Sequence, residues 1–289
     1  MKQSFTLILI IISGLACAQD TLKLVSWNLH LLPSPVFAKS KKKTRTDSIV
    51  NYFTKIDTSI NLLLFQEVFH AKRRNQLIAG LENLYPYHTP IVNSAKKRLL
   101  KTNSGLIVFS KTPIIQMDAI KYNDCSGSDC MAFKGAQFIH TVWNNTPLLV
   151  VNTHLNSEPP RSIALEQAKM IINELIPNYI EKEIPIFIGG DFNINCSDSS
   201  NYDKLLQIVK TNNSSHIDCT DISSPKVLES TLDYIFLYDD WLPEYLKLEQ
   251  NCKFQIGPSW IDSDDKKIYG KTVGFSDHHP VLMKLSFQK

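Results

Sequence analysis

The sequence predicts an α/β fold in which β-sheets are covered by helices. Short apolar runs bounded by turn residues are typical of buried strands, and they recur along the chain. Longer segments with helical apolar periodicity lie between many of these runs. Strands that alternate with helices, interrupted by hairpins, favour stacked layers of sheet and helix.

The expected strands are residues 22–28, 60–66, 105–110, 133–142, 148–153, 184–189, 232–237 and 281–287. The expected helices are residues 46–55, 71–84, 163–182 and 201–211. In the third helix, Leu165, Ala168 and Leu175 belong to an apolar stripe, and Pro159-Pro160 marks the start. No linker rich in Gly, Ser or Pro divides the pattern, and we find no internal repeat.

Residues 1–18 have the pattern of a secretory signal peptide. Lys2 supplies the positive charge, residues 7–12 form a short apolar core, and residues 16–18 fit the small-x-small cleavage rule. The apolar run is shorter than the roughly 20 residues that span a bilayer. We therefore expect a secreted chain, or one that is periplasmic or held at the cell surface. A lipid-modified Cys17 is the competing interpretation.

The cysteines fit export to an oxidising compartment. Cys125 and Cys130 lie close enough in sequence to close a small disulfide loop. No second Cys or His pair accompanies them, so the spacing does not indicate a zinc site. Cys196, Cys219 and Cys252 leave an odd count, which predicts one free thiol without identifying it.

The overall charge is too mild to indicate nucleic-acid binding by itself. The formal charge of +3 falls to +2 once Lys2 leaves with the signal peptide (3 − 1). Lysine-rich clusters at residues 39–43 and 96–98 are more often solvated loops than binding patches. Hydrophobic residues make up 43% of the chain, which is ample for a substantial core.

Polar and charged residues gather where the predicted strands end. A charge buried at a strand end without a partner costs several kcal/mol, so these clusters need a common explanation. If the strands are aligned, the residues converge at one edge of the sheets and can serve as partners for one another or for a ligand. Carboxylate and amide oxygens collected at one edge suit a hard cation such as Mg²⁺. Nearby histidines suit phosphate-ester hydrolysis, because one can activate water and another can stabilise developing charge.

The motifs at these strand ends carry a family resemblance. They are Ser-Trp-Asn (26–28), Phe-Gln-Glu (65–67), Thr-His-Leu (153–155), Gly-Asp-Phe-Asn (190–193), Leu-Asp-Tyr (232–234) and Ser-Asp-His (276–278). This ordered set resembles the endonuclease/exonuclease/phosphatase superfamily, also called deoxyribonuclease I-like. The resemblance implies a four-layer α/β/β/α sandwich of two packed mixed β-sheets flanked by helices. It also implies a single catalytic domain over residues 19–289.

The resemblance implies a metal site. Glu67 is the expected principal Mg²⁺ ligand, with Asn28 beside it, and Asp277 is expected to support the metal or the second histidine. Mn²⁺ or Co²⁺ is an alternative to Mg²⁺.

The resemblance also implies catalytic roles. His278 is the expected general base, and Asp233 is expected to hold it in the required tautomer. Asp191 and Asn193 are expected to position the nucleophilic water and bind the phosphate, and His154 is expected to donate to a phosphoryl oxygen. His30 and His279 receive no role.

Two further stretches are similar to neutral and bacterial secreted sphingomyelinases. Residues 128–136 carry the Asp-x-x-x-x-Lys-Gly segment of that group, and residues 28–33 have its Asn, apolar run and Pro. The resemblance implies hydrolysis of sphingomyelin to ceramide and phosphocholine at a membrane surface, with no obligate protein partner. Lys134 is expected to meet a lipid phosphate or a backbone carbonyl.

One departure concerns the hairpin before Ser-Asp-His, which is aromatic-rich in bacterial secreted sphingomyelinases. Here it has Trp260, a candidate substrate-binding residue, and Tyr269, but residues 264–267 at its tip are charged. Shallow membrane insertion or a different headgroup is therefore expected. Trp27, Trp260 and Tyr269 are candidates for an aromatic choline site.

Two other functions remain open from the sequence. A secreted nuclease of the same fold would use the same metal and histidines, with residues 41–43 and 96–98 meeting nucleic-acid phosphates. A catalytically silent surface-binding module is the alternative of a different class, and the intact set of acidic, amide and histidine residues argues against it.

Overall fold

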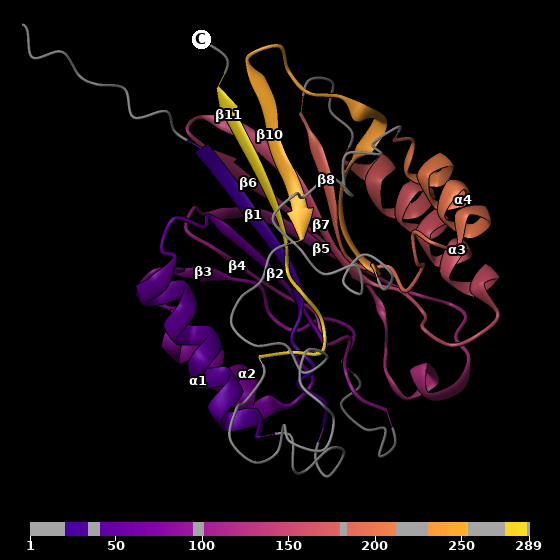
Figure 1. Ribbon diagram of the computed structural model, residues 1–289, viewed down its shortest axis with the longest axis horizontal. Helices are drawn as coiled ribbons and strands as arrows, with labels where there is room; N and C mark the ends of the chain where they lie inside the picture. The colour runs from indigo at the N-terminus through magenta and orange to yellow at the C-terminus, as the bar shows by residue number, and fades with distance from the viewer. Residues whose placement is uncertain are drawn as a thin grey trace, which may run out of the picture.

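We describe a computed structural model of the chain (Figure 1). The residues it describes are 21–33, 41–94, 101–179, 184–211, 231–253 and 275–287. Within them, no helix combines the length and the apolar character needed to cross a membrane. The expected signal peptide and Cys17 lie outside the described residues, as do Trp260, Tyr269 and residues 96–98.

Two mixed β-sheets form the centre of the molecule. The first has strand order β10-β11-β1-β2-β4-β3, and its strands are β1 (Thr21–Asn28), β2 (Leu62–Gln66), β3 (Tyr87–His88), β4 (Ile107–Ser110), β10 (Leu246–Lys253) and β11 (Val281–Phe287). The second has strand order β5-β6-β7-β8-β9, and its strands are β5 (Ile114–Lys121), β6 (Gly135–Trp143), β7 (Thr146–His154), β8 (Ile186–Asp191) and β9 (Asp233–Leu237).

Helices cover the outer face of each sheet (Figure 1). The helices α1 (Lys42–Asn51) and α2 (Ala71–Leu81) pack on the first sheet, and α3 (Arg161–Met170) and α4 (Ser199–Val209) pack on the second. The four-layer α/β/β/α arrangement predicted from the sequence is therefore confirmed.

The strands fill three apolar layers because successive side chains point to opposite faces of a sheet. In β1, Leu22 and Leu24 face the second sheet, whereas Val25 and Trp27 face α1 and α2. The two sheets approach closely at Gly189, where an added Cβ would lie 2.6 Å from Leu64 Cδ1. Each strand thus has one face between the sheets and one face under the helices.

Every strand expected from the sequence is present, and the helices differ mainly at their ends. The first helix begins at Lys42 and ends in a π-helical turn, Tyr52–Ile56. The third is α-helical only to Met170 and continues as a π-helical turn and a 3₁₀ turn to Asn178. The sequence analysis missed β3, β5 and β10. The edge strand β5 has partly or fully exposed side chains throughout, so it lacks the apolar alternation on which strand prediction depends.

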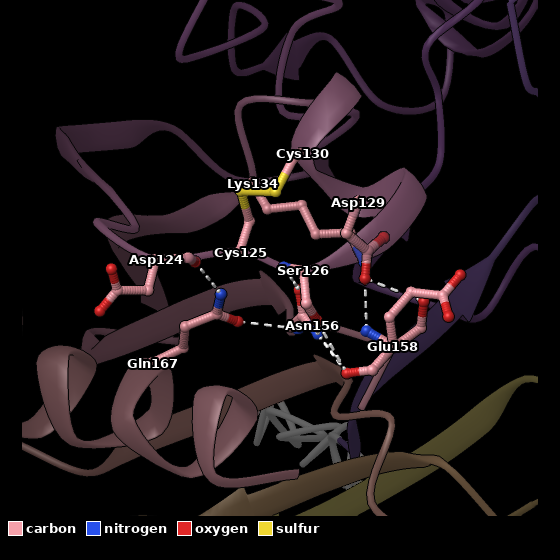
Figure 2. Close-up of a disulfide and its surroundings, with 10 residues drawn as sticks. Asp124, Cys125, Ser126, Asp129, Cys130, Lys134, Asn156, Glu158 and Gln167 are labelled. Carbon is pink, nitrogen blue, oxygen red and sulfur yellow. Dashed lines mark hydrogen bonds and ion pairs between the residues drawn. A yellow bond between two sulfur atoms is a disulfide. The ribbon is translucent and has the colours of Figure 1, made fainter. Parts of the chain in front are cut away.

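The predicted disulfide between Cys125 and Cys130 is present (Figure 2). It closes the segment between β5 and β6, and hydrogen bonds fasten this segment to the connection between β7 and α3. Ser126 N donates to Asn156 Oδ1 at 2.9 Å, and Asn156 Nδ2 donates to Ser126 Oγ at 2.8 Å. Gln167 joins both segments, since it accepts from Asn156 N and donates to the Asp124 carbonyl.

Candidate active site

The inner faces of the two sheets change from apolar to polar at one edge. The pairs β1–β2 and β7–β8 are parallel, so the carboxyl ends within each pair lie together. Positions that face between the sheets carry leucine, isoleucine or valine along most of each strand. At the ends they carry Ser26 and Asn28 in β1, Gln66 in β2, Asn152 and His154 in β7, Asp191 in β8 and Asp233 in β9. The period of two therefore directs all these side chains into one site.

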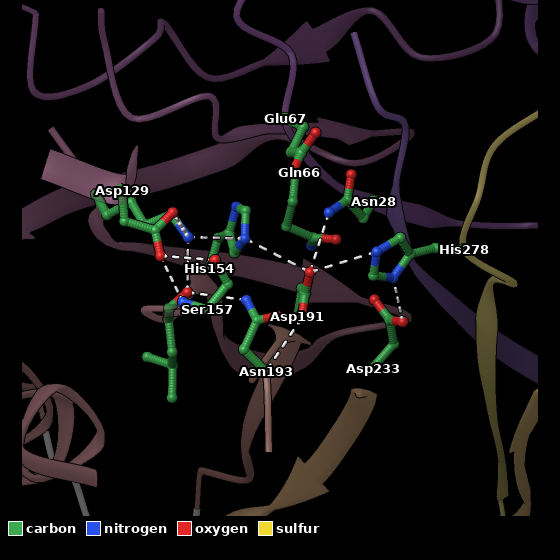
Figure 3. Close-up of polar contacts among 12 residues, drawn as sticks. Asn28, Gln66, Glu67, Asp129, His154, Ser157, Asp191, Asn193, Asp233 and His278 are labelled. Atoms are coloured by element: carbon green, nitrogen blue, oxygen red, sulfur yellow. Dashed lines mark hydrogen bonds and ion pairs between the residues drawn. The ribbon is translucent and has the colours of Figure 1, made fainter. Parts of the chain in front are cut away.

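Asp191 lies at the centre of this site (Figure 3). Its Oδ2 accepts a hydrogen bond from Asn28 Nδ2 at 3.0 Å and lies 3.5 Å from His154 Nε2 and 3.8 Å from His278 Nε2. Its Oδ1 accepts from the backbone N–H of Asn193 at 3.0 Å. Strand pairing places it directly beside His154 on one side and Asp233 on the other. One buried carboxylate thus joins groups from both sheets.

His278 and Asp233 form a tight pair. His278 Nδ1 lies 2.7 Å from Asp233 Oδ2, so the ring donates from Nδ1 and turns Nε2 toward Asp191. Burial disfavours a charged imidazole, but the carboxylates of Asp233 and Asp191 raise the pKa of His278 well above its ordinary value. A histidine held in this way has a fixed tautomer and an oriented Nε2.

The loop that carries His278 is fixed by buried donors from the first sheet and α1. Trp27 Nε1 donates to the His278 carbonyl at 2.8 Å, and Ser276 Oγ donates to the Asn28 carbonyl at 2.6 Å. The guanidinium of Arg45, which is fully buried, donates to the carbonyls of Leu29, His30 and Phe275. These bonds join the end of β1 to the loop before β11.

Glu67 and Asp277 flank His30 on the first-sheet side of the site. His30 Nδ1 lies 2.9 Å from Asp277 Oδ2 and 3.5 Å from Glu67 Oε2. Burial raises the pKa of Glu67, and the negative charge of Asp277 adds to the rise. Burial also favours a higher pKa for Asp277, but the hydrogen bond from His30 and the nearby His278 lower that pKa to about 2. Glu67 and His30 have left-handed backbone conformations, with φ of 56° and 49°, which are uncommon for such residues.

The first-sheet side fits a hard cation. Glu67 Oε2 and Gln66 Oε1 are buried acceptors that receive no hydrogen bond from the described residues. A buried oxygen without a donor is costly, and a cation that prefers oxygen ligands would satisfy it. Asp191, Asp233 and His278 also each bring a ligand-type atom within 4.8 Å of the others. The site therefore offers carboxylate, amide and imidazole groups that suit a divalent metal.

Lys134 lies on the second-sheet side and uses its three N–H groups within the protein. Its Nζ lies 2.6 Å from Asp129 Oδ1, 2.8 Å from the Leu155 carbonyl and 3.0 Å from His154 Nε2. Burial and the Lys134 charge together lower the pKa of His154 to about 3. Neutral His154 accepts from Lys134 at Nε2, so the ring proton is on Nδ1. Asp129 is held in turn by Ser157, whose Oγ donates to Asp129 Oδ2 at 2.8 Å.

The family follows from the sequence match. A model of the Endonuclease/Exonuclease/phosphatase family matches residues 25–278. The chain belongs to this family. The match covers the strand-end motifs of the site, and the resemblance described from the sequence is confirmed.

Individual members of the Endonuclease/Exonuclease/phosphatase family align over most of the chain. Sphingomyelinase C of Listeria ivanovii is 25% identical, over 90% of this chain and 85% of that protein. Phospholipase C of Staphylococcus aureus is 25% identical, over 90% of this chain and 86% of that protein. A crystal structure of Staphylococcus aureus beta toxin with bound magnesium ions has a TM-score of 0.73 and 24% identity, and covers 92% of this chain and 99% of that chain.

The structure brings most of the predicted site residues together. They are Asn28, Glu67, Lys134, His154, Asp191, Asn193, Asp233, Asp277 and His278, all at the same edge of the sandwich. Lys134 was expected to meet a lipid phosphate or a backbone carbonyl, and in the structure it donates to the Leu155 carbonyl. Asn193 Nδ2 donates to the Leu155 carbonyl, which fixes that side chain beside His154.

One sequence interpretation is wrong, and another holds only in part. Trp27 cannot line a choline site, because its ring is fully buried between the first sheet and α1 and its N–H is bound to the His278 carbonyl. Of the lysines at residues 41–43, Lys41 and Lys43 are exposed, whereas Lys42 lies in the first turn of α1 and is largely buried. The inner position of Trp27 follows from the alternation of β1, which also directs Asn28 into the site.

Several site residues were missed or left without a role. His30, which received none, lies between Glu67 and Asp277. Arg45 lies just before the helix expected over residues 46–55 and received no role, although its burial and three backbone acceptors give it a positioning role. Gln66 and Asn152 bridge the two sheets, with Gln66 Nε2 donating to Asn152 Oδ1 at 2.7 Å. The signal available for Gln66 and Asn152 was an amide at an inward position of an otherwise apolar strand.

Proposed function

We propose that this protein is a Mg²⁺-dependent phosphoric diester hydrolase of the sphingomyelinase C type, which releases ceramide and phosphocholine from sphingomyelin. The observation that carries the proposal is the oriented Asp233–His278 pair, which faces the same buried Asp191 that Asn28 and His154 contact. An imidazole held by a carboxylate beside a cation site is suited to the activation of water at a phosphodiester.

The choice of substrate rests on relatives and on the Lys134 segment. Relatives named sphingomyelinase C and phospholipase C align with 90% of the chain. The Lys134 segment, which resembles that of sphingomyelinases, lies against His154 in the site. A nuclease would need exposed cations at its substrate groove, and the burial of Lys42 removes one candidate.

We place the Mg²⁺ at Glu67, with Asn28 and Asp277 as the neighbouring ligands. The buried, unbonded Glu67 Oε2 supports this placement. When bound, the cation neutralises a phosphate oxygen and stabilises the charge that develops on the leaving oxygen. Mn²⁺ and Co²⁺ have similar ligand preferences and stay alternatives.

The protein residues then divide the proton transfers and the orientation of the substrate. His278 Nε2 removes a proton from water as the water oxygen bonds to phosphorus, and Asp233 stabilises the imidazolium through Nδ1. Asn193 and Asp191 orient the water and the phosphate. The bond between phosphorus and the ceramide oxygen breaks, that oxygen takes up a proton from solvent, and the His278 imidazolium returns its proton to solvent. Lys134 keeps His154 neutral and fixes its ring, so His154 acts as a positioned dipole at the phosphate.

We further propose an exported protein with a signal peptide at residues 1–18 and one catalytic domain over residues 19–289, acting on the membrane surface from outside. The disulfide between Cys125 and Cys130 supports an oxidising compartment. The family match over residues 25–278 supports a single domain.

A paired hydrolysis assay tests the proposed function. The purified protein is given sphingomyelin vesicles in one sample and duplex DNA in the other, each with Mg²⁺ and with an EDTA control. We expect Mg²⁺-dependent release of phosphocholine and intact DNA. Nicked DNA with untouched lipid would identify a nuclease, and the absence of both products would reject the substrate while leaving the metal site to be tested separately.

A further inference from the structure

A small cleft lies beside the active site, on the outer side of Lys134. Its volume is about 90 Å³, and its lining includes Lys101, Lys121, Phe133 and Lys134. The Lys134 ammonium crosses to His154 and Asp129, so the cleft and the catalytic site share one wall. A surface bound at this cleft therefore lies next to the active site.

Two lysine side chains converge in the cleft. Lys101 Nζ lies 5.3 Å and Lys121 Nζ lies 5.8 Å from the centroid of the Phe133 ring. Among the described residues, no carboxylate forms an ion pair with either lysine. Asp124, an exposed acid, also lines the cleft. Lys101, Lys121 and Asp124 together still carry an excess of positive charge. Two ammonium groups held on one aromatic ring repel each other, and an anion between them removes that repulsion.

The cleft is built on a rigid segment. The chain around Phe133 lies between residues 101–103 and the end of β5, with Thr102 N donating to the Met131 carbonyl at 2.8 Å and Tyr122 N donating to the Lys134 carbonyl at 3.0 Å. The disulfide between Cys125 and Cys130 closes the chain just before it (Figure 2). The two lysines are thus held on either side of a braced strand.

An exposed apolar residue is joined through its backbone to Thr102, the residue after Lys101. Met131 is 59% exposed, although its backbone is tied to Thr102, and it follows the disulfide directly. An apolar side chain beside cations matches the interface of a bilayer, where headgroup phosphates lie above the acyl chains. A free anion or a nucleic acid would use the lysines but would gain nothing from Met131.

We propose that Lys101, Lys121 and Met131 form a membrane-docking surface that binds the headgroup phosphates of anionic phospholipids and inserts Met131 at their boundary with the acyl chains. This inference rests on the proposed action on a membrane lipid and specifies how the site reaches that lipid. It makes hydrolysis in vesicles faster when the vesicles contain anionic lipid, whereas the rate of hydrolysis of a water-soluble phosphodiester does not change with anionic lipid.

Vesicle binding tests the surface separately from catalysis. The full-length protein is mixed in EDTA with phosphatidylcholine–sphingomyelin vesicles, with or without phosphatidylserine, and co-sedimentation is measured. Each Lys→Gln change should weaken binding to the anionic vesicles roughly fivefold, and Lys101→Gln with Lys121→Gln together about 25-fold. Met131→Ser should weaken binding about fivefold with or without phosphatidylserine.

The chain offers matched controls. Lys169 and Lys204 line a different cleft, between α3 and α4, so Lys169→Gln with Lys204→Gln removes the same charge elsewhere. Ile56 is 67% exposed and precedes β2 at the opposite end from Gln66, so Ile56→Ser controls for Met131→Ser. Neither control should alter binding by more than about twofold.

The possible outcomes separate this surface from the enzyme assignment. Equal binding by the Lys101/Lys121 variant and by wild type overturns the surface, even if sphingomyelin is hydrolysed. Loss of duplex DNA binding in that variant, with vesicle binding unchanged, also overturns it. Lysine-dependent vesicle binding supports it even if sphingomyelin is not hydrolysed, in which case only the proposed substrate fails. Turnover of the water-soluble phosphodiester must stay at the wild-type level in all variants, and a parallel loss counts against the surface.

Discussion

The two sides of the active site neutralise their carboxylates in different ways. On the second-sheet side, the protein supplies its own cation, because the Lys134 ammonium lies 2.6 Å from Asp129 and makes all its bonds within the protein. On the first-sheet side, His30 is the one basic residue among those described that forms an ion pair with both Glu67 and Asp277, and Glu67 Oε2 receives no hydrogen bond from the described residues. The carboxylate on the second-sheet side is therefore paired within the protein, whereas the first-sheet side can take a cation from solution.

Backbone conformation separates the two sides as well. Glu67 has a positive φ angle of 56°, which glutamate seldom adopts, whereas histidine is enriched at positive φ and His30 adopts it more readily. On the second-sheet side, the corresponding residue is Asn193, at φ 52°, and asparagine tolerates this conformation. Strained backbone persists where the surrounding structure holds it, and it clusters at functional sites. The strain therefore lies on the side that we assign to the metal.

The largest effect is expected at His278, which lies where the two sides meet. His278→Ala should lower kcat for sphingomyelin by roughly 10²–10⁴-fold, because a positioned general base contributes about that much. The fold should be retained, since the His278 carbonyl that binds Trp27 belongs to the backbone. Initial rates of phosphocholine release and circular dichroism measure the two effects.

The matched control for His278 is His88→Ala, at an exposed position of β3. It should leave kcat within about twofold of wild type. Retention of most activity in His278→Ala would remove the general-base assignment, and with it the view that the two sides act on one phosphate.

Removal of the Glu67 charge should affect only the first-sheet side. Glu67→Gln should lower activity roughly 10²–10³-fold by weakening Mg²⁺ binding. In EDTA, however, its free energy of unfolding should exceed that of wild type by about 1 kcal/mol, because a buried charge without a donor is replaced by a neutral amide. Initial rates of phosphocholine release measure the loss of activity, and thermal unfolding with and without Mg²⁺ measures the change in stability and in Mg²⁺ binding.

Glu82→Gln is the control for Glu67, because Glu82 is exposed at the end of α2. Wild type and this control should be stabilised by Mg²⁺ and should lose activity in EDTA. If Glu67→Gln were stabilised by Mg²⁺ as strongly as wild type, the metal would have to be placed elsewhere, for example at Asp191, Asp233 and His278.

The contrast between the two sides also explains what the sequence could predict. The strands that carry the site and the residues at their ends were predictable, because alternation in β1 and β8 directs Asn28 and Asp191 to the same side. The contact of Lys134 with His154 was not, since the two residues come from separate segments that only the folded chain brings together. Arg45 gave no signal either, because a basic residue in an amphipathic helix is usually solvated.

Asp129→Asn should disturb the second-sheet side and spare the metal. Asparagine can still accept from Ser157, but it leaves the buried Lys134 ammonium without its carboxylate. We expect a loss of about 3 kcal/mol in the free energy of unfolding and about a tenfold fall in kcat through misplacement of His154. The Mg²⁺ concentration that gives half-maximal activity should stay unchanged.

Asp124→Asn is the control, because Asp124 is an exposed acid directly before the disulfide loop and its backbone carbonyl, which the substitution retains, accepts from Gln167. A shift in the Mg²⁺ requirement of Asp129→Asn would show that the two sides are coupled and that the Lys134 network is more than a scaffold.

The smallest effect is expected from the disulfide, which braces the second-sheet side from outside. Cys125→Ser with Cys130→Ser opens a short loop, so the chain-entropy model gives a loss of about 2 kcal/mol in the free energy of unfolding. Activity should fall less than about threefold, because the bonds of Asn156 and Ser157 to the loop remain. Urea unfolding measures the stability loss, and reduced wild type should match the double variant. A fall in kcat as large as that of Asp129→Asn would mean that the disulfide, rather than the ion pair, holds Lys134 against His154.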